Sequence, residues 1–408
     1  EFRRVLFRSP VLMNKITDID ILNKRILIRV DFNVPLMNGN VTDNFRIKSA
    51  LPTIRYCLEN NTSIVIMSHL GRPNGALDEE YSLYPVADEL EKLLGLPIIF
   101  SDDCVSEDSI STSEGLKSGE VHLLENLRFH QGETDNDAGF SQQLARHGDI
   151  YVNDAFGTAH RAHASNVGIL DFIPVSSSGF LLDGERNYLS DAIENPVKPF
   201  VVVLGGSKIS GKIELIENMM EYASDIIIGG AMAFTFLKAQ GFNTGGSLID
   251  SDRLAIASEL LNKAKSKNIS IHLPKDVLAS IEISETSSWR ISDVDGLKND
   301  EIGLDIGPES CIEFEQILAD ANTILWNGPL GVYEISNYAV GTQFIAKSIL
   351  KFTEAGTTSI IGGGDTSAAI SALNFNNGFT HISTGGGASL ELLSGNYLPA
   401  FKALDDHG

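Results

Sequence analysis

Three glycine-rich runs each follow a run of β-branched residues and come before a helical pattern. They are residues 205–208 (GGSK) after 200–204, residues 362–366 (GGGDT) after 359–361, and residues 384–387 (TGGG) after 381–383. A glycine turn between a buried parallel strand and a helix leaves backbone N–H groups unpaired at the strand end, with the helix dipole aligned behind them. Glycine suits such a turn because a side chain would hold a ligand away from the backbone. The three runs therefore predict phosphate binding.

Two lysines, Lys208 and Lys212, lie four residues apart in the first of these runs and its continuation (GGSKISGK). We expect both ammonium groups to project from one side of the first helical turns, toward the ligand of the glycine turn. A pair of solvated lysines is the alternative. The run is not a P-loop, because Ile213 follows Lys212 where that motif requires Ser or Thr.

Acidic residues follow the later strands of the second half. Asp365, with Thr366 beside it, comes directly after the glycines at a predicted helix start. Mg²⁺ favours one or two carboxylates together with phosphate oxygens and water, so the sequence predicts Asp365 as a magnesium ligand. Capping of the helix by Asp365 or Thr366 is compatible with that role. In the run 326–334 (WNGPLGVYE), a constrained turn is expected to place Glu334 where it can bond a ribose hydroxyl.

The first half places polar and basic residues immediately after its predicted strands. Because the carboxyl ends of parallel strands meet at one edge of a sheet, four arginines and three histidines are expected to lie together in an otherwise acidic protein. Arginine binds phosphate or carboxylate bidentately and keeps its charge, so the pattern predicts a pocket for a small, multiply charged anion. The residues concerned are Asp31, Asn33, His69, Arg72, Arg128, Asn153, Asp154, His160, Arg161 and His163, with Arg46 opening a helix.

These residues allow two other interpretations. Each arginine could be a surface ion-pair partner and each histidine a satisfied strand-end residue. A metal site at residues 160–163 (HRAH) is disfavoured, because neither a helical i, i+4 pair nor a carboxylate partner is evident.

The elements that position these residues alternate between strand and helix. Strand-like runs occur at 25–30, 63–67, 121–124 and 149–152, with helical patterns between them such as 46–59 and 85–94. The alternation starts again after Pro196, with strands at 199–204, 225–228, 269–273, 323–326 and 358–361. We therefore predict an α/β protein with two doubly wound, parallel-sheet (Rossmann-like) domains joined by an interdomain helix.

The predicted boundaries follow from that alternation. Residues 13–184 form the N-terminal domain, 185–196 the interdomain helix and hinge, 197–387 the C-terminal domain, and 388–408 a segment that packs back on the N-terminal domain. Residues 1–12 carry three arginines and too few apolar residues for a signal peptide. We interpret them as a scar of cloning or sequence assembly before a natural start at Met13, with a clipped transit peptide as the alternative.

Composition narrows the functional classes. The 408 residues carry a net charge of −23, which argues against a general affinity for nucleic acid or an acidic membrane surface. No stretch approaches about 18 uninterrupted apolar residues, so no transmembrane span is expected. Cys57, Cys104 and Cys311 are widely spaced, without a C-x-x-C pair or a nearby histidine, which suggests neither disulfides nor a zinc site. The sequence predicts a cytoplasmic protein.

Short motifs occur throughout the chain from about Met13 to the C-terminus. They are RVDFNVP (29–35), SHLGRP (68–73), ENLRF (125–129), NDAFGTAHRAHAS (153–165), GGSKISGKI (205–213), WNGPLGVYE (326–334), GGGDT (362–366) and STGGGAS (383–389). With these motifs the chain resembles the phosphoglycerate kinase family. The departures are minor, because Ser207 stands where alanine is common and Gly211 is a flexible choice between the lysines, and neither removes a charged group.

The resemblance implies reversible transfer of the acyl phosphate of 1,3-bisphosphoglycerate to Mg-ADP, giving 3-phosphoglycerate and ATP. It also implies a monomer without nucleic-acid or membrane partners. The implied glycerate-binding residues, in the N-terminal domain, are Asp31, Asn33, Arg46, His69, Leu70, Gly71, Arg72, Arg128 and Arg161. The implied nucleotide-binding residues, in the C-terminal domain, are Lys208, Lys212, Gly229, Gly230, Asn327, Glu334, Gly363, Gly364, Asp365 and Thr366, with Asp365 on Mg²⁺. The implied catalytic residues are Arg46, Lys208, Lys212, Gly364 and Gly386.

That reaction requires no general base, because a carboxylate is the leaving group in one direction and the attacking group in the other. Catalysis then consists of positioning and electrostatics, and we expect His160 and His163 to orient or support rather than to catalyse. The two ligands must meet in line, so hinges are expected near 187–194 and 383–387. Two other functional classes are the alternatives: a non-catalytic anion-binding scaffold and a dinucleotide-dependent oxidoreductase. The lack of G-x-G-x-x-G after the first strand argues against the oxidoreductase.

Overall fold

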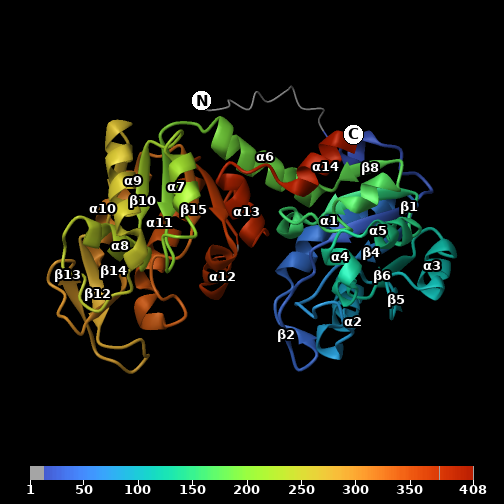
Figure 1. Cartoon of the computed structure of the whole chain (residues 1–408), viewed down its shortest axis with the longest axis horizontal. Helices are drawn as coiled ribbons and strands as arrows, with labels where there is room; N and C mark the ends of the chain where they lie inside the picture. Colours follow the sequence, from blue (N-terminus) through green and yellow to red (C-terminus); the bar gives the residue numbers. More distant parts are fainter. Residues whose placement is uncertain (1–12, 376, 408) are drawn as a thin grey trace. The chain divides into compact units, whose positions relative to one another are not determined.

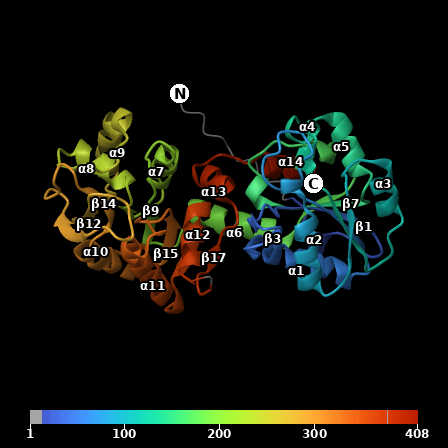
Figure 2. The same ribbon diagram turned by 90° about the horizontal axis from the view of Figure 1, so that it is seen from below.

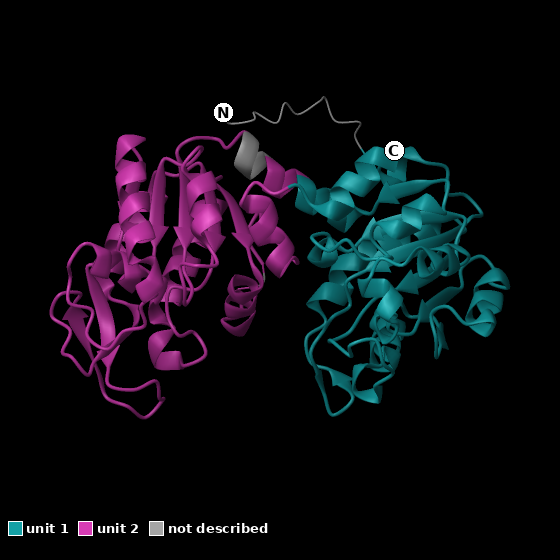
Figure 3. Cartoon of the chain, viewed as in Figure 1, with its two compact units in different colours: residues 1–186, 397–408 teal, residues 187–396 magenta. Residues whose placement is uncertain are grey.

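The chain divides into two compact units. The computed structural model describes residues 13–375 and 377–407, and the backbone alone of residues 191–194. The predicted scar at residues 1–12 lies outside the described residues. Unit 1 comprises Glu1–Arg186 with Tyr397–Gly408, and unit 2 comprises Asn187–Asn396 (Figure 3). The division falls within helix α6 (Phe180–Glu194).

The C-terminal return to unit 1 starts later than residue 388, where the sequence places it. Helix α13 (Gly386–Leu393) contacts α7 (Ile213–Met219), so it stays with unit 2. From Tyr397 onward the chain belongs to unit 1, where it forms α14 (Pro399–His407).

Unit 1 is built on six parallel strands in the order β5-β6-β4-β1-β7-β8. The central strands β1 (RILIRV) and β4 (SIVIM) are apolar runs buried on both faces, as parallel strands between two helical layers must be. The strands are β1 (Arg25–Val30), β4 (Ser63–Met67), β5 (Ile98–Ser101), β6 (Val121–Leu124), β7 (Ile150–Asp154) and β8 (Ser176–Ser178), beside the hairpin β2 (Leu36–Met37) and β3 (Asn40–Val41).

Helices cover both faces of this sheet (Figure 2). Helices α1 (Phe45–Glu59) and α2 (Tyr84–Leu94) bury Ile47, Ile54 and Leu90 against Ile28 and its neighbours on one face. Helix α14 lies against β8, and its Phe401 ring stacks on Phe156 with 6.0 Å between centroids. The remaining helices of this unit are α3 (Glu107–Glu114), α4 (Gln131–Thr134) and α5 (Ala138–Ala145).

Unit 2 has its own six parallel strands, in the order β11-β10-β9-β15-β16-β17, and Figure 1 shows the helices around them. The two parallel sheets confirm the predicted α/β class with two doubly wound domains. The strands are β9 (Phe200–Leu204), β10 (Asp225–Ile228), β11 (Ser270–His272), β15 (Thr323–Asn327), β16 (Thr358–Gly362) and β17 (His381–Ile382). The other helices are α8 (Met232–Ala239), α9 (Leu254–Ser266), α10 (Pro308–Ala319), α11 (Val340–Glu354) and α12 (Gly364–Ala372).

Unit 2 also contains a sheet that the sequence pattern does not predict. Strands β13 (Trp289–Asp293), β12 (Asp276–Ser280) and β14 (Ile302–Ile306) pair antiparallel. Strand β13 is mostly exposed, so it lacks the apolar run that marks a buried strand. None of the described helices combines the length and the apolar composition that a membrane span needs.

Candidate active site

The loops after the unit 1 strands bring the predicted basic residues to one edge of the sheet. Asp31 follows β1, and Arg46 lies at the start of α1. Arg46 Nη1 donates a hydrogen bond to Asp31 Oδ2 at 2.5 Å. The Nδ1 atom of His69 lies 3.8 Å from Asp31 Oδ1. A Cβ on Gly157 would lie 2.0 Å from Asp31 Oδ2, so only glycine lets the turn after β7 close over this carboxylate. We use the name basic edge for His69 together with Arg46, Arg72, Arg128 and Arg161.

A buried ion pair lies beneath the basic edge. Arg29 and Glu133 have fully buried side chains, and Arg29 Nη2 lies 3.9 Å from Glu133 Oε1. Arg29 Nε donates to Ser165 Oγ at 2.8 Å, and Ser165 Oγ donates to Glu133 Oε1 at 2.6 Å. Burial opposes ionisation of Glu133, but nearby His163 and Arg29 outweigh it and lower its pKa. The charges of Arg29 and Glu133 are therefore paired, as charges out of water must be.

Arg29 of this pair also determines the protonation state and the tautomer of the His69 ring. Arg29 Nη2 lies 3.4 Å from His69 Nδ1, and a guanidinium can only donate, so Nδ1 is the acceptor. Burial, and then the charge of Arg29, lower the pKa of His69 far below its ordinary value. The ring is therefore neutral and carries its proton on Nε2. His69 can donate to an anion without adding charge.

Asn33 and Arg128 shape the loop that follows β4. Gly71 N donates to Asn33 Oδ1 at 2.9 Å, and Arg128 Nη1 donates to the Gly71 carbonyl at 2.7 Å. Gly71 has φ +60°, and a Cβ there would lie 2.1 Å from the Tyr81 ring, so glycine is required. Leu70 is buried, whereas Arg72 is exposed. Asn33, Leu70 and Gly71 line an open cavity of about 540 Å³ together with Tyr81.

Arg128 and the loop after β7 complete the basic edge. Burial, and then Arg29, lower the pKa of Arg128 to about 10, which leaves it cationic at neutral pH. Arg161 is exposed. Burial, and then the charge of Arg161, lower the pKa of His160 to about 4. His160 is therefore neutral. Ala400 N of α14 donates to the Ala159 carbonyl at 3.0 Å and so supports this loop.

In unit 2, the glycine turns that follow β9 and β10 pack closely against each other and against the turn that follows β15. A Cβ on Gly205 would lie 2.0 Å from the Pro329 carbonyl oxygen, and one on Gly230 (φ +65°) would lie 2.7 Å from Gly206 N. A Cβ on Gly229 would meet the Leu330 side chain at 2.6 Å. At these positions the glycines are needed for contact between loops, not only for ligand approach.

The two lysines do not lie on a helix, contrary to the expectation from their spacing. Helix α7 begins at Ile213, after both of them, because the chain forms turns up to Lys212. Lys212 Nζ donates to the Gly205 carbonyl at 2.7 Å, and to the carbonyl and Oδ1 of Asn327 at 2.7 and 2.6 Å. Burial lowers the pKa of Lys212 to about 7, with Asp365 acting in the opposite direction. Lys208 is exposed.

The N-termini of α12 and α13 meet at Gly364, which is exposed, and Gly386, which is half-buried. A Cβ on Gly386 would lie 3.4 Å from Gly364 N, which is an ordinary contact distance. Figure 1 shows the two helices next to each other. Helix N-termini carry partial positive charge and unpaired N–H groups, so their convergence favours an anion. Gly363 (φ +91°) precedes α12, and a Cβ there would lie 2.8 Å from Asn327 Nδ2.

The remaining predicted nucleotide residues have different surroundings. Thr366 is buried, where its Oγ1 donates to the Gly362 carbonyl at 2.8 Å and accepts from Gly328 N at 2.6 Å. The Thr366 hydroxyl therefore holds two turns together. Asp365 and Glu334 are exposed. The pKa of Tyr333 is raised mainly by burial of its own hydroxyl, and the charges of Glu334 and Asp365 raise it further.

The structure thus places the predicted glycerate residues in unit 1 and the predicted nucleotide residues in unit 2. Sequence reasoning gave no role to Arg29 or Glu133, which form the buried ion pair. A signal for Arg29 existed, because a charged residue inside an apolar strand run (RILIRV) must find a buried partner. Gly211, one departure from the family pattern, has open space around its Cβ position and is not required by packing.

Known proteins resemble this chain over nearly its full length. A model of the family described as "Phosphoglycerate kinase" matches residues 16–396. The phosphoglycerate kinase of Chlorobium luteolum is 49% identical over 391 residues, which cover 96% of this chain and 98% of that protein. That of Rippkaea orientalis is 47% identical over 387 residues, covering 95% of this chain and 97% of that protein.

The solved structures that resemble this chain are also phosphoglycerate kinases. The phosphoglycerate kinase from Coxiella burnetii superposes with a TM-score of 0.86 at 40% identity, covering 97% of this chain and 99% of that one. The enzyme from Pyrococcus horikoshii gives 0.85 at 32% identity, with the same coverage of 97% and 99%. The chain belongs to the phosphoglycerate kinase family.

Proposed function

We propose that this chain catalyses the reversible transfer of the acyl phosphate of 1,3-bisphosphoglycerate to Mg-ADP, giving 3-phosphoglycerate and ATP. The observation that carries the proposal is the meeting of α12 and α13 at Gly364 and Gly386, where main-chain amides are left open to a phosphoryl group. We expect the protein to act as a monomer in the cytoplasm, with the two glycerates and ADP or ATP as its ligands.

The basic edge of unit 1 suits the glycerate. 3-Phosphoglycerate carries a phosphate and a carboxylate, and both match the planar fork of arginine. Arg72 and Arg161 are exposed and available to these groups, while Asn33 and Arg128 hold the loop that carries Arg72. Neutral His69 adds an N–H donor.

Catalysis requires cations and N–H groups around the moving phosphoryl group, and no proton transfer. Arg46 in unit 1 supplies one cation. In unit 2, Lys208, Lys212 and the amides of Gly364 and Gly386 supply the rest. Lys212 has a second task, because its three bonds join the Gly205 and Asn327 turns. Fixed donors of this kind stabilise charge that develops in the transition state.

Asp365 fits the role of magnesium ligand. Its carboxylate is exposed in the first turn of α12, next to the Gly364 amide, so it can share an ion with a phosphate held there. When bound, Mg²⁺ supplies charge neutralisation of the nucleotide phosphates.

The two ligands must approach within about 3 to 3.5 Å for transfer. Because the glycerate residues and the nucleotide residues belong to different units, we propose that the units close on each other during turnover. Residues 187–194 of α6 and residues 383–387 are the proposed hinges.

The proposal is tested by coupling ATP formation from 1,3-bisphosphoglycerate and Mg-ADP to a reporter enzyme. We expect ATP to form with the full chain, and none beyond background when 1,3-bisphosphoglycerate is omitted. A folded protein that binds both ligands but forms no ATP would instead be the anion-binding scaffold.

A further inference from the structure

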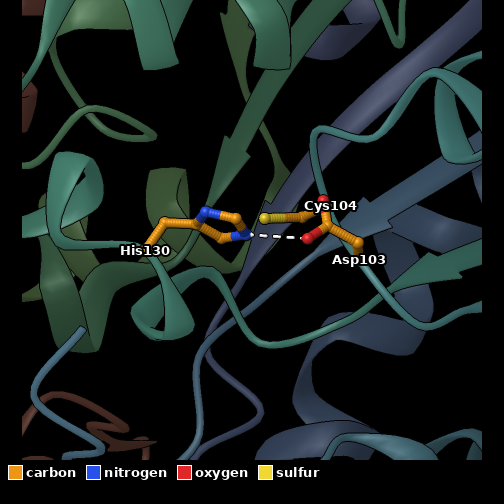
Figure 4. Close-up of side chains that lie close together, drawn as sticks. All are labelled: Asp103, Cys104 and His130. Atoms are coloured by element: carbon orange, nitrogen blue, oxygen red, sulfur yellow. Dashed lines mark hydrogen bonds and ion pairs between the residues drawn. The ribbon is translucent and has the colours of Figure 1, made fainter. Parts of the chain in front are cut away.

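Three potential metal ligands come together in unit 1, in the loops preceding α3 and α4. Asp103 and Cys104 follow β5, and His130 precedes α4. One ligand atom from each residue lies within 4.8 Å of the others. Figure 4 shows the Cys104 sulfur directed toward the His130 ring and the Asp103 carboxylate. The sequence suggests no zinc site, because His130 is distant from Cys104 along the chain, whereas the fold brings the three residues together.

Each of the three residues is held in place by other contacts. Asp103 Oδ1 accepts from Val105 N at 2.6 Å and from Ser106 N at 2.8 Å, so Oδ2 is left to face His130 Nε2 at 3.1 Å. The fully buried Cys104 has its carbonyl bonded by His147 Nε2 at 3.0 Å. The His130 ring lies against Phe140, with 5.3 Å between centroids. Ligands that are oriented in this way need little reorganisation to bind a metal.

The ligand chemistry favours zinc. Thiolate, imidazole and carboxylate together suit Zn²⁺, whereas Mg²⁺ and Ca²⁺ prefer oxygen ligands. Metal–ligand bonds of about 2.0 to 2.3 Å set tetrahedral ligands roughly 3.3 to 3.8 Å apart, so ligand atoms that lie up to 4.8 Å apart must approach by about 1 to 1.5 Å. His130 and Asp103 side chains are 31% and 38% exposed, which leaves one coordination position open to water.

The local charge also favours a cation. Burial raises the pKa of the Cys104 thiol, and the negative charges of Asp103, Glu133 and Glu125 raise it further. A bound dication would offset this negative field. Binding would exchange the Cys104 S–H bond for a sulfur–metal bond, and the proton would pass to solvent.

We propose that Asp103, Cys104 and His130 form a zinc site with three protein ligands and one open position. Its role is to join the loops before α3 and α4 and so to stabilise unit 1. It takes no part in phosphoryl transfer.

The test uses the metal-free full chain without nucleotide, titrated with Co²⁺ as a spectroscopic substitute for Zn²⁺. We expect one equivalent to give a thiolate-to-cobalt charge-transfer band, which Zn²⁺ abolishes and excess Mg²⁺ does not. Cys104→Ser should lose the band. Cys57→Ser and Cys311→Ser are matched controls, since both cysteines are also buried, and they should keep it. Absence of the band in the parent protein, or its survival in Cys104→Ser, would overturn the proposal.

Two further variants keep the thiol and decide the matter if Cys104→Ser does not fold. His130→Gln and Asp103→Asn should each weaken Zn²⁺ binding at least tenfold in competition with a chelating dye. Zn²⁺ should also raise the melting temperature of the parent protein more than that of either variant. Affinity equal to that of the parent in either variant would show that the bound metal lies elsewhere.

Discussion

Arg46 and Arg29 illustrate two kinds of arginine at the same sheet edge. Arg29 is fully buried, paired with Glu133, and determines the state of His69. The side chain of Arg46 is 29% exposed and is anchored on one side by Asp31, so its other nitrogens can reach a ligand. The buried arginine therefore shapes the basic edge, and the exposed one is the expected contact to the transferring group.

Replacing Arg46 by Ala should lower kcat by about 100-fold to 1,000-fold and change the KM for 3-phosphoglycerate far less. The reason is that the guanidinium meets charge that develops only in the transition state. Steady-state kinetics in the ATP-consuming direction measure both constants. Arg55→Ala, on the same helix but bonded to the Leu93 carbonyl, is the matched control and should behave as the parent protein. An unchanged kcat with a raised KM would assign Arg46 to substrate binding instead.

Lys212 and Lys208 should differ in their effect on stability. Lys212→Met leaves three buried oxygen acceptors without their donor, so we expect the free energy of unfolding of unit 2 to fall by about 2 to 4 kcal/mol. Lys208→Met should stay within about 0.5 kcal/mol, because Lys208 is exposed. Urea denaturation followed by tryptophan fluorescence reports unit 2, which holds both tryptophans, Trp289 and Trp326. Equal stability of the two variants would contradict the assigned roles.

Among the structural elements, the glycine turns look alike in sequence but serve two purposes. Gly205 and Gly230 allow neighbouring turns to touch, because a Cβ at either would lie within 2.7 Å of backbone. Gly364 and Gly386 have room for a Cβ, and glycine there keeps the amides open. A glycine pattern predicts where a turn lies, but only the fold shows what a side chain would meet.

Gly386→Ala should therefore separate activity from stability. The added methyl group would lie 3.4 Å from Gly364 N and partly cover that amide, so we expect kcat to fall at least tenfold, as for loss of a transition-state donor. The melting temperature should not fall, because alanine suits a helix better than glycine. Gly230→Ala, with φ +65° and a backbone clash, should instead lower the melting temperature. Loss of stability in Gly386→Ala would argue for a packing role.

The parallel sheets could be predicted because their strands are apolar runs followed by polar or glycine turns. The basic edge could be predicted because parallel strands end at one side of a sheet. Strand β13 could not be predicted, because its mostly exposed residues resemble those of a loop. The start of α7 could not be predicted either, because the spacing of two lysines does not show whether they lie in a helix or in turns. The cluster at Cys104 depends on contact between loops that are separate in sequence, for which a single sequence carries no signal.

The two units should respond differently to acid. Burial lowers the pKa of His122 and His147 in unit 1 to about 4, from 6.5 in the unfolded chain. The unfolded state then binds more protons, so this stability is complete above pH 6.5 and is lost as the pH falls to about 4, by roughly 3 kcal/mol for each histidine. His160 and His69 act in the same direction. Asp154, whose pKa burial raises to about 7, offsets part of the loss.

In unit 2, a buried carboxyl group makes the folded state more stable as the pH falls. Burial raises the pKa of Asp305 to about 8, so the folded unit binds this proton more readily and gains stability as the pH falls below 8. On acidification from pH 7 to 4, far-UV circular dichroism should therefore report loss of unit 1 before tryptophan fluorescence reports loss of unit 2. Coincident transitions, or earlier loss of the fluorescence signal, would contradict this order.

At the scale of the whole molecule, the central claim is that a phosphoryl group passes directly from one ligand to the other. The glycerate is held by arginines and the nucleotide by main-chain amides. Direct transfer has no phosphorylated enzyme as an intermediate. The exchange of isotopic label between ADP and ATP, followed with and without 3-phosphoglycerate, tests this claim most directly. We predict exchange only when 3-phosphoglycerate is present. Exchange without it would reveal a phosphoenzyme, and no exchange with it would show that the chain is not this kinase.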